Sequence, residues 1–252
     1  MANLPALPGP DLDVEIAALA YAYGRANGPF LKLVNRIGHG VEAQLGRLPD
    51  TMRTELERAV ARALEKAHGL AAVGRRAPDL GPRGATWAAM VTGAAGGAAG
   101  LAGALVELPV TITVMLHAIR GQAQAAGYDP DDPAVRLACL EVFSAGSPLR
   151  SDDGVNTAFL SARLAMTGGT LQKALAVVVP RLAAVFGQKL AAQAVPVLGA
   201  VTGAALNAAF LNYYREVARI RFRLMRLSEV HGAEAVLAGF AEAQKTPVLT
   251  VR

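Results

Sequence analysis

Three ionisable residues near the middle of the chain, Glu107, His117 and Arg120, are of types that suit acid–base chemistry. A carboxylate close to a histidine can exchange protons with a substrate. Glu107 is the only charged residue between positions 85 and 116. Its place beside Pro109 also predicts the start of a helix whose dipole stabilises the carboxylate. Two interpretations follow: a structural carboxylate, or a soluble, hydrolase-like enzyme with an acid–base site around Glu107, His117 and Arg120.

The sequence carries no motif of the common catalytic classes. It has no GxxxxGK phosphate loop, no GxSxG nucleophile elbow and no HExxH zinc motif. The four histidines are scattered along the chain, so we expect no metal site and no cofactor. The single cysteine, Cys139, lies in an apolar run and is expected to be a buried, inert thiol in a reducing compartment.

The elements that position these residues are predicted to be helices. The chain of 252 residues is 53% hydrophobic, 18% charged and carries a net charge of +5. Apolar residues recur at helical spacing, and alternating strand patterns are hard to find. We therefore expect an all-α fold with a single multi-helix domain over residues 12–244. A flexible N-terminal tail over residues 1–11 and a C-terminal tail over residues 245–252 flank it.

Local signals place the ends of several helices. Prolines, glycines and capping residues predict a break at 107–109 and a capped start at Asp132-Pro133. An amphipathic helix beginning at Asp50 or Thr51 should bury Leu56, Val60, Leu64 and Ala67. The remaining helices are expected over about 13–23, 30–48, 110–126, 152–166, a stretch ending near 193, a stretch ending near 228, and 233–246.

Two Ala/Gly-rich segments without charge, Ala85–Val106 and Leu190–Tyr214, lie near the centre of the predicted domain. Each is long enough to span a bilayer, but alanine and glycine partition weakly into lipid, so spanning is not expected. Glycines four residues apart allow close helix contact. The segments predict either the buried centre of a bundle or a face that contacts lipid or a membrane protein. The residues that would form this contact are Gly93, Gly97, Gly199 and Gly203, with Trp87, Tyr213 and Tyr214 at the ends.

A stripe of four arginines follows the second segment. Arg215, Arg219, Arg223 and Arg226 fall within one arc of a helical wheel, opposite Val217, Ile220, Leu224 and Leu227. Glu216 is the only acid within the run, which predicts that the stripe is not neutralised. It is either a solvated helix face or a contact with an anionic membrane, where four basic residues contribute about 4 kcal/mol. Nucleic acid is not expected as a partner, because no recognised motif accompanies the stripe.

Several motifs in order resemble the signature of the EcsC family. The first block contains Gly96-Gly97, then Glu107-Leu108-Pro109, Ile119-Arg120, Gly127-Tyr128 and Leu140-Glu141-Val142-Phe143. The second contains Val195-Pro196, Gly203-Ala204, Asn207, Ala218-Arg219 and Phe222-Arg223. Glu107 stands where the pattern more often has aspartate, and Gly127-Tyr128 reverses its Tyr-Gly order. The family takes its name from a gene beside those of an ABC transporter, so the resemblance implies a transporter-associated role.

These patterns together predict an EcsC-like cytoplasmic protein at the inner face of the membrane. It would bind an anionic membrane surface, or a membrane protein such as an ABC transporter, through its apolar helices and the arginine stripe. An acid–base enzyme is the alternative.

Overall fold

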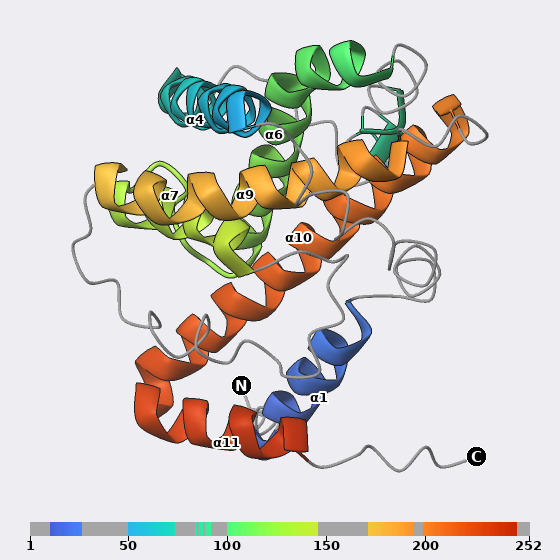
Figure 1. Ribbon diagram of the computed structural model, residues 1–252. Coiled ribbons are helices and arrows are strands. Elements are labelled where there is room, and N and C mark those ends of the chain that lie inside the picture. The colour runs from blue at the N-terminus through green and yellow to red at the C-terminus, as the bar shows by residue number, and fades with distance from the viewer. Residues whose placement is uncertain are drawn as a thin grey trace, which may run out of the picture.

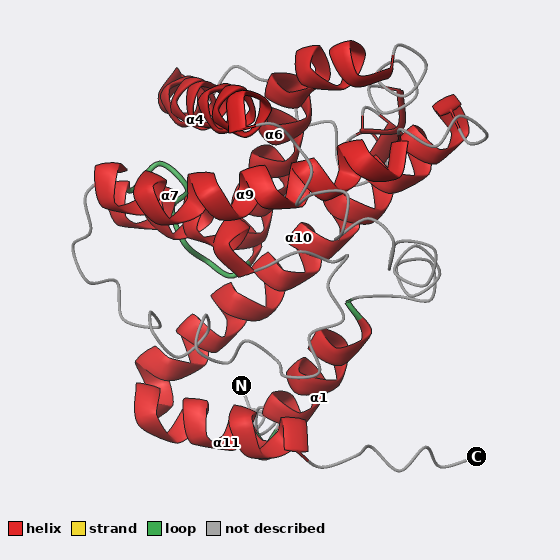
Figure 2. Cartoon of the chain, in the orientation of Figure 1, coloured by secondary structure: helices red, strands yellow, loops and turns green. Residues whose placement is uncertain are grey.

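The computed structural model describes residues 11–26, 50–73, 84, 86–87, 89–91, 100–145, 171–193 and 199–245, and within these ranges it contains helices and no strand. The helices are joined by short turns where the connections are described (Figure 2). This confirms the predicted all-α class. The elements are α1 (Leu12–Arg25), α4 (Asp50–Val73), α6 (Gly100–Ala125), α7 (Pro133–Glu141), the 3-10 helix η2 (Val142–Ala145), α9 (Leu171–Gln193), α10 (Gly199–His231) and α11 (Ala233–Lys245).

The long helix α10 packs against α6, α9, η2, α1 and α11, while α4 packs on α6 and α9. Helix α10 runs diagonally through the molecule, with α4 and α6 towards one end and α1 and α11 at the other (Figure 1). One side of α10 is buried in the core, including Val217, Ile220, Leu224 and Leu227, as the wheel predicted. The amphipathic helix α4 likewise buries Leu56, Val60, Leu64 and Ala67.

The first and last helices pack against each other. The rings of Tyr23 and Phe240 meet edge to face with centroids 6.2 Å apart. Gly239 lets α1 approach closely, since a Cβ there would lie 3.1 Å from Ile16 Cδ1. Both helices also pack on α10.

The structure confirms the predicted capped start of α7 at Asp132-Pro133. Asp132 Oδ1 accepts from the N–H groups of Ala134 at 2.8 Å and Val135 at 3.2 Å, with Pro133 in the first turn. Gly127 has φ +88°, and the Tyr128 N–H donates to the carbonyl of Ala123 at 3.1 Å. This left-handed glycine closes the end of α6 as a Schellman motif.

The predicted break at 107–109 is wrong, because α6 continues through Pro109. Proline inside a helix costs about 3 kcal/mol through its missing N–H and its ring. Packing outweighs that cost: Leu108, Ile112 and Met115 are all buried on one side of the helix. The Thr113 hydroxyl donates to the Pro109 carbonyl at 2.7 Å, and the ribbon of α6 bends in its first half (Figure 1).

The other predicted elements divide into two groups. The helices ending near 193 and 228 and the last helix are confirmed as α9, α10 and α11, and α1 extends the first helix by a residue or two at each end. The helices predicted over 30–48 and 152–166, residues 1–10 of the N-terminal tail and residues 246–252 lie outside the described residues. None of the described helices combines the length and hydropathy needed to cross a membrane.

Candidate functional site

Glu107 lies at the centre of a buried polar cluster that joins three parts of the chain. The Thr111 hydroxyl, one turn later on α6, donates to Glu107 Oε1 at 2.7 Å. The Asn207 amide of α10 donates to the same carboxylate oxygen and to the Ala89 carbonyl, the latter at 3.0 Å. Glu107, Thr111 and Asn207 are all buried. The cluster therefore fastens the backbone near Ala89 to α6 and α10.

The structure does not bring the predicted acid–base residues together. Glu107 is buried against α10, whereas His117 is exposed on α6. Ten residues of helix separate them, which is about 15 Å along the axis. Arg120 donates to Asp131 Oδ1 at 2.7 Å and so holds the turn after α6. The described partners of Glu107 are the neutral residues Thr111 and Asn207. The predicted role at a helix start is wrong, because α6 begins at Gly100.

Trp87 and Val91 form an exposed apolar pair on the segment that this cluster holds. Residues 84, 86–87 and 89–91 are helical, and side chains four apart share a helix face. Trp87 is 66% exposed and Val91 61%, while Ala89 between them is 1% exposed. The segment thus turns its alanine inward and its two large apolar side chains towards solvent. We call Trp87 and Val91 the apolar face.

Tyr213 and Tyr214, expected beside Trp87 as aromatic anchors, are buried instead. The Tyr214 ring packs against Phe143 of η2, with centroids 5.1 Å apart. A tyrosine enclosed by its own chain has no contact with a membrane, so these two residues are removed from the predicted surface. The aromatic pattern in the sequence did not distinguish a core tyrosine from an interfacial one.

The described residues do not test the predicted contact role of the four glycines. Gly93 and Gly97 lie outside the described residues. Gly199 and Gly203 lie in the first two turns of α10, in the part whose side-chain surroundings are not described. Their role in close helix contact therefore stays a prediction.

The arginine stripe lies on the solvent side of α10, and three of its four arginines pair with carboxylates. Arg219 donates two hydrogen bonds to Glu216, at 2.6 and 3.0 Å, and this bonding raises the pKa of Arg219. Arg223 pairs with Glu15 of α1, and Arg226 pairs with Glu229 at 2.7 Å. The expectation that pairing leaves the stripe uncompensated is therefore wrong. Glu15 lies 208 positions from Arg223, so no local pattern could have revealed it.

Arg215, the first residue of the stripe, has a neutral partner. It donates to Asn212 Oδ1 at 2.9 Å, one turn earlier on α10. Arg221, by contrast, is buried and donates to Glu141 at 2.8 Å. The outer side of the helix therefore carries three half-exposed arginines and the partly buried Arg215, and one buried arginine, Arg221, joins α7 to α10.

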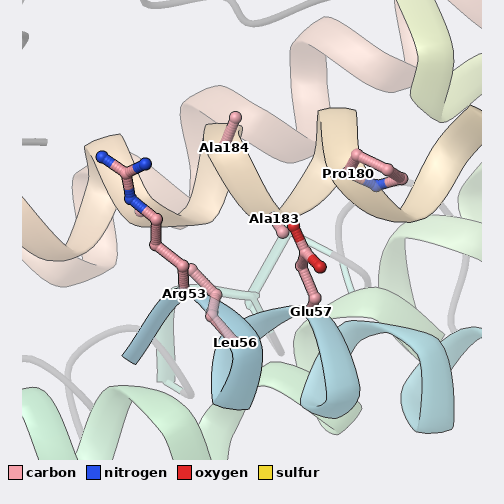
Figure 3. Close-up of a pocket in the computed structure, with 7 residues that line it drawn as sticks. Arg53, Leu56, Glu57, Pro180, Ala183 and Ala184 are labelled. Carbon is pink, nitrogen blue, oxygen red and sulfur yellow. The ribbon is translucent and has the colours of Figure 1, made fainter. Parts of the chain in front are cut away.

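Two hollows open on the described surface. One, of about 280 Å³, lies between α4 and α9, where Ala183, Ala184 and Gly187 leave space beside Leu56. Figure 3 shows Arg53 and Glu57 reaching from α4 towards α9 on its rim. The other, of about 250 Å³, lies between α1, α6 and α10 and is lined in part by Arg219 and Arg223. We call the second hollow the arginine pocket.

Neither hollow contains an obvious nucleophile. Cys139, the described thiol, is fully buried, and burial raises its pKa to about 12, so it stays protonated near neutral pH. Within the described part of the chain, no three His, Cys, Asp or Glu residues gather in a metal-binding group.

Comparison with known proteins identifies one family. The model of the EcsC protein family matches residues 70–227, which is more than half of the chain. The matched range includes α6, α7, α9 and most of α10, whereas α1, α11 and most of α4 lie outside it. No curated protein and no solved structure matches the chain.

Proposed function

The chain belongs to the EcsC protein family, and from that premise we propose that it is a peripheral membrane-binding protein that contacts an anionic bilayer through Trp87 and Val91. The main support for this proposal is that both side chains are exposed. They lie on a segment whose inner side is held to α10 by the hydrogen bond from Asn207 to the Ala89 carbonyl. A large apolar side chain held in water by a fixed backbone favours any surface that covers it. Tryptophan is also enriched at the interface between lipid and water.

The free energy available from burying Trp87 and Val91 in lipid supports weak, reversible membrane binding. Full burial of a large apolar side chain contributes about 1.5–3 kcal/mol, so the apolar face contributes up to about 3–6 kcal/mol on entering lipid. The upper end of that range resembles the affinity of a protein with a single fatty-acyl anchor. The net charge of +5 adds a long-range attraction to an anionic leaflet.

The arginine stripe can assist this contact in spite of its ion pairs. Arg219 and Arg226 are about half exposed and pair with glutamates one turn away. Exposed pairs of this kind contribute about 0–1 kcal/mol each. Exchanging a glutamate for a lipid phosphate therefore costs little.

A flotation assay tests the proposal with vesicles of phosphatidylcholine, with or without phosphatidylglycerol. We expect the wild-type protein to float with the anionic vesicles and Trp87→Ser/Val91→Ser to remain in the soluble fraction. Val230→Ser is the matched control, because Val230 is 72% exposed on α10, far along the chain from the apolar face. It should float like the wild type.

Two results would contradict the proposal. One is a wild-type protein that ignores anionic vesicles, and the other is a double variant that floats as well as the wild type. A membrane protein such as an ABC transporter is the other occupant of this face that the family name suggests. Vesicles that contain no membrane protein distinguish the lipid surface from a transporter partner. If the partner is a transporter, the protein should not float with such vesicles.

A further inference from the structure

The arginine pocket combines positive charge with an apolar wall. Arg219 and Arg223 line it from successive turns of α10, and Gln122 of α6 adds an amide. Ala18 and Leu19 of α1 line the same hollow, which measures about 250 Å³. Ala125 and Ala126, at the end of α6, complete this apolar lining.

We propose that the arginine pocket binds the phosphate monoester head of an amphiphile. Side chains four residues apart on a helix are neighbours, at about 5–6 Å between Cβ atoms. A phosphate monoester has three terminal oxygens, so one group can accept hydrogen bonds from both arginines and from the Gln122 amide. Arginine suits this role because its planar fork donates two parallel hydrogen bonds to phosphate.

Glu15 already shows that the pocket accepts an anion. Its carboxylate lies in the pocket wall and pairs with Arg223, which is half exposed. A phosphate monoester carries a charge of about −1.5 to −2 near pH 7, against −1 for the carboxylate. The ligand therefore competes with Glu15 for Arg223 and with Glu216 for Arg219.

The tail of the amphiphile has an exposed apolar path beside the pocket. Val14, Ala18 and Tyr21 are spaced by four and three residues and share one face of α1. Val14 and Tyr21 are exposed, and Ala18 between them lines the pocket. An acyl chain that leaves the phosphate can lie along this face. The α1 wall lies outside the range that the family model matches, whereas α6 and α10 lie inside it.

Isothermal titration with lysophosphatidic acid below its micelle concentration tests the proposal. Losing two charge-assisted contacts predicts that Arg219→Gln/Arg223→Gln weakens binding by about tenfold or more. Arg226→Gln is the matched control, because Arg226 lies on the same outer side of α10 and does not line the pocket. Its affinity should equal that of the wild type.

Glu15→Gln gives the distinguishing result. Removing the internal competitor should tighten binding, whereas a purely structural role of the Glu15–Arg223 pair predicts weaker binding. If the double arginine variant fails to fold, Ala18→Trp blocks the pocket from an exposed position while keeping both arginines, and it too should abolish binding. Unchanged affinity in the arginine variant or in Ala18→Trp, or a weaker Glu15→Gln complex, would overturn the proposal.

Two further ligands separate the head from the tail and from a membrane. Glycerol 3-phosphate should bind more weakly than lysophosphatidic acid, because it lacks the acyl chain. Lysophosphatidylcholine should not bind, because its phosphate is a diester with choline and no longer a monoester. Equal binding of all three would contradict the proposal. Trp87→Ser/Val91→Ser should keep its affinity for lysophosphatidic acid, so failure of the membrane contact and failure of this site give different results.

Discussion

Arg219 and Arg221 lie two residues apart on α10 and have opposite surroundings. Arg219 is 46% exposed and pairs with Glu216 across one turn of its own helix. Arg221 is 3% exposed and pairs with Glu141 at the end of α7. Charge alone therefore says little about function in this helix: the buried arginine fixes two elements together, and the exposed one can exchange its partner.

Replacing these arginines one at a time should give very different losses of stability. Arg221→Met removes a buried cation from the Glu141 carboxylate, whose side chain is 14% exposed, and this should lower the free energy of unfolding by about 3–5 kcal/mol. Arg219→Met, the matched control, should lower it by less than about 1 kcal/mol. Urea denaturation followed by circular dichroism measures both. Similar small losses in the two variants would contradict a structural role for the Arg221 pair.

At the same scale, the sequence identified polar residues better than it identified their partners. Glu107 stood out as one charge in a long apolar stretch, and the structure buries it. Its described partners are the neutral residues Thr111 and Asn207. Asn207 lies 100 positions away, so only the packing of α10 on α6 brings it there. Sequence spacing within one helix pointed instead to His117 and Arg120.

Capping residues and tertiary packing both decide where the helices of this chain begin and end. The capped helix start at Asp132-Pro133 was predicted from proline and aspartate alone, because capping uses only neighbouring residues. The break at Pro109 was wrong because the gain from burying one side of α6 depends on α4 and α10. Local rules therefore located the ends of elements and overestimated the effect of a single proline.

The left-handed glycine at the end of α6 gives a prediction at this scale. Gly127→Ala forces a Cβ into φ +88°, which should lower the free energy of unfolding by roughly 1–2 kcal/mol. Gly121→Ala is the control, since Gly121 lies inside α6 with open space around a Cβ. It should raise stability by about 0.5–1 kcal/mol. Thermal melts compare the two, and a loss in both, or in neither, would contradict the assigned turn.

The whole molecule combines the range that the family model matches with described helices outside it, namely α1, α11 and most of α4. Residues 70–227 belong to the matched core, and α1 with α11 closes on the last turns of α10. The all-α class followed from helical periodicity, which is a property of the whole sequence. The contact of α1 with the arginine stripe did not, because it joins positions 15 and 223.

The central claim, that the apolar face enters a membrane, is tested most directly by the fluorescence of Trp87. Trp87 is the only tryptophan in the chain, so the emission spectrum of the wild-type protein reports on this residue alone. On titration with vesicles containing phosphatidylglycerol, we predict that emission shifts to shorter wavelength and is quenched by bromine atoms on the lipid chains. Emission that stays at the wavelength of an indole in water, unquenched at every lipid concentration, would contradict the account.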